Sequence, residues 1–333
     1  MQRSSERAHE WGKRRRGLWL GVAVTLAFVA CSKKQSGTAP TVDTGPSISS
    51  VVNAEWGGAE GQLGHTVPDE GLPEGPKSFV VDEKSIIHVL DQENGRIQKF
   101  AAGKSGGVVA LPARPFDDLE LDAKGYVLLD AHSDPALVFV DSSGAVTNEV
   151  PLAGPEIPEP SLVTALVRFA DGLYVEIEDA YLVHVTDATG GAVEQSVVPG
   201  QVIDGSAALK LESVDDKRLA LFRVGLADGT PTPVTELSFP ERVAERSLFT
   251  SAKNGGSLIA LRLELDQPDP ETPPLSQSTL VVLEPNGNER RRVDLPQSEA
   301  VDDVFRAVRR GADGNVYVMK TSDSGVEIVK VKP

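Results

Sequence analysis

The residues of this chain that could support acid–base or metal chemistry are few. The five histidines are His9, His65, His88, His132 and His184. The strand pattern places His88 in mid-strand, His132 in a turn and His184 in a later strand of its repeat, so they share no equivalent position. We therefore expect structural or surface histidines and no ring of metal ligands.

Motifs for metal and nucleotide chemistry are also scarce. The sequence contains no His-Glu-x-x-His zinc motif, no Walker phosphate loop and no EF-hand calcium loop. Four aspartates recur instead at equivalent places of two repeats, and these are Asp82, Asp91, Asp122 and Asp130. Aspartate side chains accept hydrogen bonds from nearby backbone amides, so we interpret them as caps of turns and strand ends. We predict no catalytic residue, no metal site and no cofactor.

The single cysteine, Cys31, follows a basic cluster at residues 13–16 and an uncharged apolar run at residues 17–30. That order is typical of a secretory signal, and the run is shorter than the roughly 20 apolar residues that span a membrane. The segment 28–31 resembles the lipobox of bacterial lipoproteins, which implies that Cys31 is lipidated and becomes the first mature residue. An N-terminal membrane anchor that is never cleaved is the alternative.

The residues around Cys31 also bear on its destination. Ser32 follows it and, by resemblance to enteric sorting rules, favours the outer membrane over the inner one. Residues 15–18 match the twin-arginine pattern weakly, so the export route stays open. We expect residues 1–30 to be a cleaved signal peptide and residues 31–47 to be a lipid-anchored flexible tether. Such a polar chain reaches roughly 20–25 Å.

The net negative charge of the chain argues against some classes of binding partner. The whole chain carries a net charge of −16, and residues 1–30 hold six basic and two acidic residues, so the rest carries −20. An acidic body repels phosphate backbones, which argues against nucleic acid as a partner. The same argument assigns membrane attachment to the lipid on Cys31 and not to a basic patch.

Beyond the tether, short apolar runs alternate with Gly, Asp, Asn and Pro clusters, which is the pattern of strands. Predicted strands include residues 78–81, 86–90, 126–129, 136–140, 173–177, 219–224, 258–263, 279–283 and 316–319. The segment 240–247 could hold one turn of helix. Turns between the first and second strands of successive units are predicted near Ser85, Gly125, Gly172, Asp215, Gly256 and Gly314. Their spacing matches the 40–50 residues of a four-stranded propeller blade.

One stretch carries a family resemblance. Residues 81–100, with Val81-Asp82, Leu90-Asp91 and Asn94-Gly95, resemble the NHL repeat, and Trp56-Gly57-Gly58 resembles the segment that precedes it. The resemblance implies an all-β fold for residues 48–333, a six-bladed β-propeller of four-stranded antiparallel blades. Seven blades or two β-sandwiches are the alternatives. The family includes binding scaffolds and enzymes, so the fold does not decide the function.

The last repeat supplies three strands only, which predicts how the ring closes. A three-stranded final blade would leave a long unpaired edge. The strand-like segment 48–56 has no blade of its own. We predict that it pairs beside residues 326–331 as the outer strand of the last blade.

Some six-bladed propellers are metal-dependent hydrolases or lyases, which need several oxygen ligands converging on the central channel. The inner-strand position seven residues before the first turn is occupied by Ser78, Asp118, Ala165 and Ala307. One carboxylate among four positions does not make a cation cage. A metal-dependent hydrolase or lyase therefore stays as the alternative function only.

Loop lengths predict a binding face. Second-to-third-strand turns and blade-to-blade links open on the same side of a propeller. We assign Gln62–Gly75 and Pro151–Pro160 to links, and Gln92–Gly95, His132–Pro135, Gly225–Pro233 and Gln267–Pro274 to second-to-third-strand turns. The candidate binding residues on them are Glu93, Asn94, His132, Asp134, Glu156, Glu159, Asp269 and Glu271. Acidic loops stiffened by proline suit a basic or polar partner, and solvated linkers are the alternative. The predicted function is a cell-envelope scaffold that binds a protein, peptide or glycan.

Overall fold

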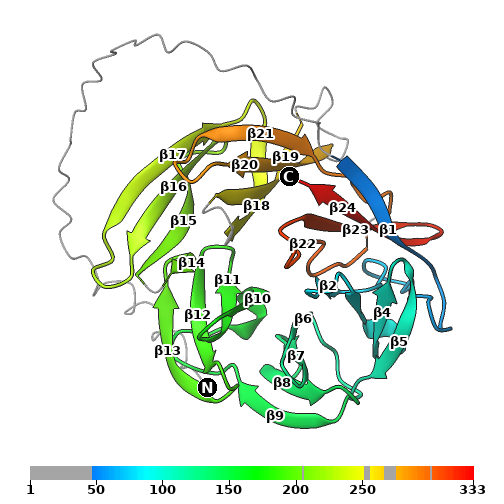
Figure 1. Cartoon of the computed structure of the whole chain (residues 1–333). Helices are drawn as coiled ribbons and strands as arrows, with labels where there is room; N and C mark the ends of the chain where they lie inside the picture. The colour runs from blue at the N-terminus through cyan, green and yellow to red at the C-terminus, as the bar shows by residue number, and fades with distance from the viewer. Residues whose placement is uncertain (1–46, 205, 251–255, 266–274, 301) are drawn as a thin grey trace, which may run out of the picture. The chain divides into compact units, whose positions relative to one another are not determined.

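A computed structural model describes residues 47–333 except 205, 251–255, 266–274 and 301. It contains six antiparallel sheets, each of four strands, arranged as the blades of a propeller (Figure 1). Residues 44–333 form one compact unit. The predicted all-β, six-bladed propeller fold is confirmed, and the alternatives of seven blades and two sandwiches are excluded.

The blades follow one another along the chain. Blade 1 holds β2 (Ser78–Val81), β3 (Ile87–Asp91), β4 (Arg96–Ala101) and β5 (Lys104–Ala110). Blade 2 holds β6 (Asp118–Leu121), β7 (Gly125–Asp130), β8 (Ala136–Asp141) and β9 (Val146–Pro151). Blade 3 holds β10 (Val163–Phe169), β11 (Gly172–Ile177), β12 (Tyr181–Asp187) and β13 (Ala192–Val198).

The second half continues the pattern with longer strands. Blade 4 holds β14 (Gln201–Asp204), β15 (Ala207–Ser213), β16 (Arg218–Gly225) and β17 (Pro231–Ser238). Blade 5 holds β18 (Arg242–Thr250), β19 (Ser257–Glu264), β20 (Ser276–Leu283) and β21 (Glu289–Asp294). Blade 6 holds β22 (Val308–Arg310), β23 (Val316–Ser322), β24 (Gly325–Lys332) and, outermost, β1 (Ser47–Glu55).

The last blade closes as predicted, because β1 pairs antiparallel with β24 (Figure 1). Ser47 pairs with Lys332 at one end and Glu55 with Gly325 at the other, with a register shift between Ser50 and Val52. Trp56, just beyond β1, donates its indole N–H to the carbonyl of Ser322 at 2.9 Å. The two ends of the propeller domain are thereby held in one sheet.

Apolar residues are buried between adjacent blades, and this explains the sequence pattern. β3 is buried at all five positions, and β7 at five of its six. Both faces of such a strand pack against the adjacent blades. Outer strands alternate instead, as β13 does. One core cluster joins blades 1 and 2 through residues such as Leu90, Ile97 and Leu128. Another joins blades 2 and 3 through Leu129, Leu166 and Val175.

Three local predictions were wrong. Residues 240–247 hold no helical turn, because β18 pairs with β19 from Arg242 onward and one isolated turn of helix is not stable by itself. The turn at Asp215 joins β15 to β16, the second and third strands. The segment Gly225–Pro233 consequently joins the third strand to the fourth. The last two errors have one origin, because β14 was not identified as the inner strand of blade 4.

Strands within a blade alternate in direction, so the connections sort onto two faces. We call the face with the second-to-third-strand turns and the blade-to-blade links the link face. We call the face with the first-to-second-strand and third-to-fourth-strand turns the turn face. The segments 62–75, 92–95, 132–135 and 151–160 open on the link face as predicted, whereas 225–233 opens on the turn face. The segment 267–274 lies outside the described residues.

Candidate functional site

The centre of the ring is organised by Asp118, the first residue of inner strand β6. Its carboxylate is fully buried. Oδ1 accepts hydrogen bonds from the Ser78 hydroxyl at 2.5 Å and from its neighbour's amide, Leu119 N, at 2.9 Å. Oδ2 accepts from the amide of Leu166, on β10, at 2.9 Å. The carboxylate thus joins the inner strands of blades 1, 2 and 3.

Two arginines from blade 6 complete this network. Arg309, only 5% exposed, donates to Asp118 Oδ1, to Glu120 Oε1 at 2.6 Å and to the Leu119 carbonyl at 2.8 Å. Arg306 donates to the Leu166 carbonyl at 2.8 Å and lies 3.4 Å from Asp118 Oδ2. Because β22 and β10 belong to blades that are not neighbours, these side chains bridge the inner strands around the axis.

This arrangement decides what Asp118 can do. The only acid at the aligned channel position is already satisfied by amides, a hydroxyl and two guanidinium groups. Those cations would also repel a metal ion. Among the described residues, no three or more His, Cys, Asp and Glu side chains are placed to hold a metal. The residues therefore do not fit the site of a metal-dependent propeller enzyme.

Glu176, on β11, is the channel acid with the most unusual environment. Burial raises the pKa of Glu176, while the positive charges of Arg306 and Arg246 and a hydrogen bond with Gln201 act in the opposite direction. A cavity of about 20 Å³ lies beside these residues. That space suits about one water molecule, which is too little for an organic substrate.

The four histidines of the described chain each have separate partners. His65 stacks on Trp56 with ring centroids 4.3 Å apart, and its Nε2 lies 2.9 Å from Asp302 Oδ1. His184 stacks on Tyr174, also at 4.3 Å. The remaining two lie elsewhere, His88 at 2.9 Å from the Tyr126 hydroxyl and His132 at 3.2 Å from an Asp117 carboxylate oxygen. Burial lowers the pKa of His88. These contacts are local and do not converge on a site.

One segment of blade 1 has the residue spacing of a serine-hydrolase motif. Residues Gly103–Gly107 read Gly-x-Ser-x-Gly. A nucleophile elbow needs a turn from a strand into a helix, whereas this segment forms the β4–β5 hairpin. The Ser105 hydroxyl donates to Glu60 Oε1 at 2.6 Å and accepts from Gln98 Nε2 at 3.2 Å. The motif is therefore part of a structural hydrogen-bond network.

The predicted aspartate caps take the roles expected of them, with one difference. Asp82 accepts from the amides of Lys84 and Ile86, and Asp130 accepts from three amides of the following turn. Asp91 instead accepts from the amide of Gly64, in the link that follows β1, at 2.7 Å. One carboxylate oxygen therefore holds a distant segment, while the other accepts from Asn94 in the turn that follows β3.

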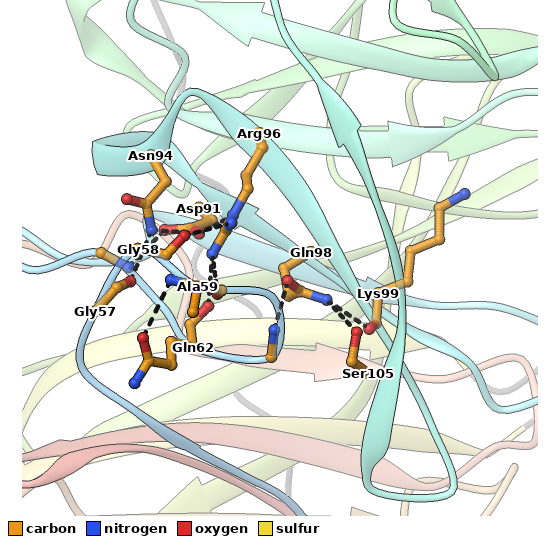
Figure 2. A network of polar contacts seen from close by, with 12 residues as sticks. Gly57, Gly58, Ala59, Gln62, Asp91, Asn94, Arg96, Gln98, Lys99 and Ser105 are labelled. Atoms are coloured by element: carbon orange, nitrogen blue, oxygen red, sulfur yellow. Dashed lines mark hydrogen bonds and ion pairs between the residues drawn. The ribbon is translucent and has the colours of Figure 1, made fainter.

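Figure 2 shows the polar network that holds this link against blade 1. Arg96 donates to Asp91 Oδ2 at 2.7 Å and to the carbonyls of Gly58, Ala59 and Gln62. Asn94, a predicted binding residue, donates its side-chain amide to the Gly57 carbonyl at 3.0 Å and to Asp91 at 2.8 Å. Asn94 is thus occupied by a structural role, and its neighbour Glu93 is partly buried.

The structure brings together four other predicted binding residues. His132 and Asp134 lie in the turn between β7 and β8, with side chains 57% and 83% exposed. Glu156 and Glu159 lie in the link between β9 and β10, beside η3 (Pro160–Leu162). The amide of Leu152 donates to the Pro135 carbonyl at 3.0 Å, so turn and link are adjacent on the link face. Asp269, Glu271 and Cys31 lie outside the described residues.

The described part of the link face is acidic. Its connections carry Glu60, Asp69, Glu70, Glu74, Glu93, Asp117, Asp134, Glu156, Glu159, Glu178, Asp179, Asp215, Asp216, Glu241, Glu299, Asp302, Asp303 and Asp323. The same described segments hold four basic residues, namely Lys77, Arg114, Lys217 and Arg306.

Each of those four cations is engaged within the protein. Lys77 pairs with Asp303 at 2.5 Å, and Arg114 pairs with Asp130 at 2.6 Å. Lys217 donates to the Pro240 carbonyl at 2.7 Å, and Arg306 is held in the channel. The acidic side chains therefore set the charge that a partner would meet on this face.

Comparisons with known proteins add no closer identification. No family model matches the chain, and no curated protein matches its sequence. Among solved structures, similarity extends to Kuenenia stuttgartiensis hydrazine synthase, at 13% identity and a TM-score of 0.46, over 76% of this chain and 75% of that one. A β-propeller domain of Myceliophteria thermophila Cps50 (Swd1) gives 15% identity and a TM-score of 0.42, over 79% and 85%. Virginiamycin B lyase from Staphylococcus aureus gives 12% and 0.38, over 78% and 95%.

These likenesses are too distant to transfer an activity, so the fold rests on the strand pairing itself. No helix in the described part of the chain is long and apolar enough to cross a membrane.

Proposed function

We propose that this chain is an exported lipoprotein whose propeller, of the NHL-repeat type, is a binding scaffold in the cell envelope. Cys31 carries the lipid and anchors the protein, in the outer membrane by the sorting argument given above. The link face binds a basic or polar protein, peptide or glycan. The binding part of this proposal is supported by the geometry of the link face. The lipid anchor is proposed from the sequence of residues 13–32 alone.

The observation that carries the binding proposal is the charge of the link face. Acidic side chains are spread over connections from every blade, while the cations of the same described connections are paired internally. A surface with one dominant sign of charge steers partners of the opposite sign and raises their association rate. Asp134, Glu156 and Glu159 come from a turn and a link that the Leu152–Pro135 hydrogen bond joins, which supports this sector as part of the proposed binding surface.

The residues of the central channel also favour a binding role over a metal-dependent reaction. Arg306 and Arg309 occupy the place where a metal-dependent propeller enzyme needs oxygen ligands. The pKa of Glu176 is raised, as for a general acid, but Glu176 adjoins space for about one water only. Metal analysis of the purified protein tests the enzyme alternative. Stoichiometric calcium or zinc would overturn the scaffold proposal.

Charge neutralisation on the link face is the direct test. The triple variant Asp134→Asn, Glu156→Gln, Glu159→Gln should weaken binding of a fluorescent oligolysine peptide roughly tenfold, at about 0.2–1 kcal/mol for each lost exposed pair. The matched control is Glu83→Gln with Asp228→Asn, two exposed acids of the turn face.

Cross-linking in intact cells extends this test to the native partner. The triple variant should lose cross-linked species that the control variant keeps. Equal retention of both the peptide and the cross-linked species by the two variants would contradict the proposal.

A further inference from the structure

The turn face differs from the link face in one sector, where blades 5 and 6 meet. A cavity of about 430 Å³ opens there. Its apolar walls include Leu258, Val282 and Leu283, and Arg290, Arg310 and Lys332 bring three cations to it. Two acidic side chains, Glu284 and Asp313, also line it, as does Pro333 with the carboxylate at the end of this chain.

The cations of this cavity are not all engaged within the protein, unlike those of the link face. Asp313 is engaged by Lys330 at 2.7 Å, by Asn315 at 2.7 Å and by the Tyr317 hydroxyl at 2.9 Å. Within the described part of the chain, the exposed side chains of Arg290 and Lys332 make no hydrogen bond or ion pair. A chain whose net charge is −16 therefore presents two cations at this cavity, Arg290 and Lys332, that are open to an anion.

The position of this cavity relative to the tether is fixed by the closing strand. Lys332, on the cavity, pairs in register with Ser47, the first residue of β1. Residues 31–46 precede Ser47, and sixteen residues of their polar composition reach roughly 20–25 Å. The tether thus joins the propeller on the turn face, at the edge of the basic cavity, and away from the acidic link face.

We propose that this cavity binds the anionic headgroups of the membrane in which the protein is anchored, so that the link face is directed away from the bilayer. The inference rests on the proposed lipidation of Cys31. A tether of that length allows many orientations by itself. It also holds the cavity at a high effective concentration of headgroups, so weak charge contacts can select one orientation. Anionic headgroups are expected to repel the acidic link face. In the proposed orientation that face points away from the bilayer.

The test uses the full-length lipidated protein in vesicles. Since the chain has one cysteine and the proposal gives it a lipid, an introduced cysteine is the only free thiol. Asn288→Cys places a fluorophore on the turn face beside the cavity, and Asp323→Cys places one on the link face of blade 6. Nitroxide-headgroup lipid should quench the label at 288 at least threefold more than the label at 323. This contrast should be present in phosphatidylglycerol vesicles and lost in pure phosphatidylcholine.

Charge variants identify the residues responsible. Arg290→Ala with Lys332→Ala should reduce quenching of the 288 label on phosphatidylglycerol vesicles and leave phosphatidylcholine vesicles unaffected. Two charges at about fivefold each predict roughly a 25-fold loss in headgroup affinity. Lys124→Ala, which removes a turn-face cation in blade 2, is the matched control and should change little.

The outcomes separate this inference from the proposed function. Equal quenching at 288 and 323 in vesicle-bound protein, or stronger quenching at 323, overturns the orientation and leaves the lipid anchor standing. An equal effect of Lys124→Ala overturns the cavity as the docking site. Displacement from phosphatidylglycerol by millimolar glycerol phosphate would assign the cavity to a soluble ligand and overturn the membrane contact. Protein that carries no fatty acid overturns both proposals.

Discussion

Asp118→Asn is the sharpest probe of the arginine network at the centre of the ring. The substitution keeps the shape of the side chain but removes its charge. Arg309, which is 5% exposed, then retains only Glu120 as an anionic partner, and one buried amide or guanidinium donor loses its acceptor. The variant should fold, because the amide oxygen in the place of Oδ1 can still accept from Ser78 and Leu119, while the Leu166 amide loses its acceptor on Oδ2.

The expected cost follows from burial. Removing one partner of a buried ion pair lowers the free energy of unfolding by about 3–5 kcal/mol. Because neutral asparagine still accepts some hydrogen bonds, we expect a loss of about 2–4 kcal/mol. The exposed pair Arg262–Glu245, at 45% and 60% exposure, gives the matched control. Glu245→Gln should cost less than about 1 kcal/mol.

Urea denaturation measures these free energies for Asp118→Asn and Glu245→Gln. It also measures them for Arg309→Met and for the double variant Asp118→Asn with Arg309→Met. The double variant should be less unstable than the sum of its single variants by about 1 kcal/mol or more, because each change removes the charge that the other leaves unpaired. If Asp118→Asn costs no more than Glu245→Gln, the network does not hold the inner strands together and our account of the channel is wrong.

Four further predictions concern other parts of the molecule. Deleting residues 48–56 exposes β24 and the buried side chains of its sheet, so the free energy of unfolding should fall by at least about 3 kcal/mol; unaltered thermal unfolding would contradict the ring closure. Burial lowers the pKa of His88 below its ordinary 6.5, so the stability that its neutral form provides is present above about 6.5 and decreases as the pH falls toward the lower folded pKa. His88→Gln should flatten that part of the stability–pH curve, and a parallel curve would refute the assignment. Burial raises the pKa of Glu176 above its ordinary 4.5, so Glu176→Gln should stabilise the protein at neutral pH, with an advantage that shrinks as the pH falls to 4.5; calorimetry at two pH values checks this. Cys31→Ser should leave the protein unprocessed or soluble, and unchanged fractionation and fatty-acid labelling would argue against lipidation.

The sequence was sufficient for the architecture because each blade repeats its own local signals. Asp and Gly at the turns, with apolar runs between them, located most strands and the closing segment 48–56. The prediction assigned the wrong strand order in blade 4, because β14 was not identified as its inner strand. That single omission moved the turn at Asp215 one strand too early and placed Gly225–Pro233 on the wrong face.

The candidate site was less predictable because its contacts are distant in sequence. The alignment singled out Asp118, but nothing near it indicated that arginines at 306 and 309 would reach it from the last blade. Asn94 was selected because it sits in a link-face turn. Its role became visible only once the link after β1 was found packed against Arg96. By contrast, Asp134 and Glu159 remain exposed at their loop positions, although Arg114 lies 3.8 Å from the Asp134 carboxylate.

The pairing of β1 with β24 also sets an order of events during biogenesis. Blade 6 needs residues 47–55 and residues 325–332 in the same sheet. A chain that is made from its N-terminus must therefore carry its opening strand unpaired until the last strand has emerged. Closure of the ring is then a late step, after the other five blades have had time to form. Completion of the fold is delayed for as long as translation keeps these two strands apart.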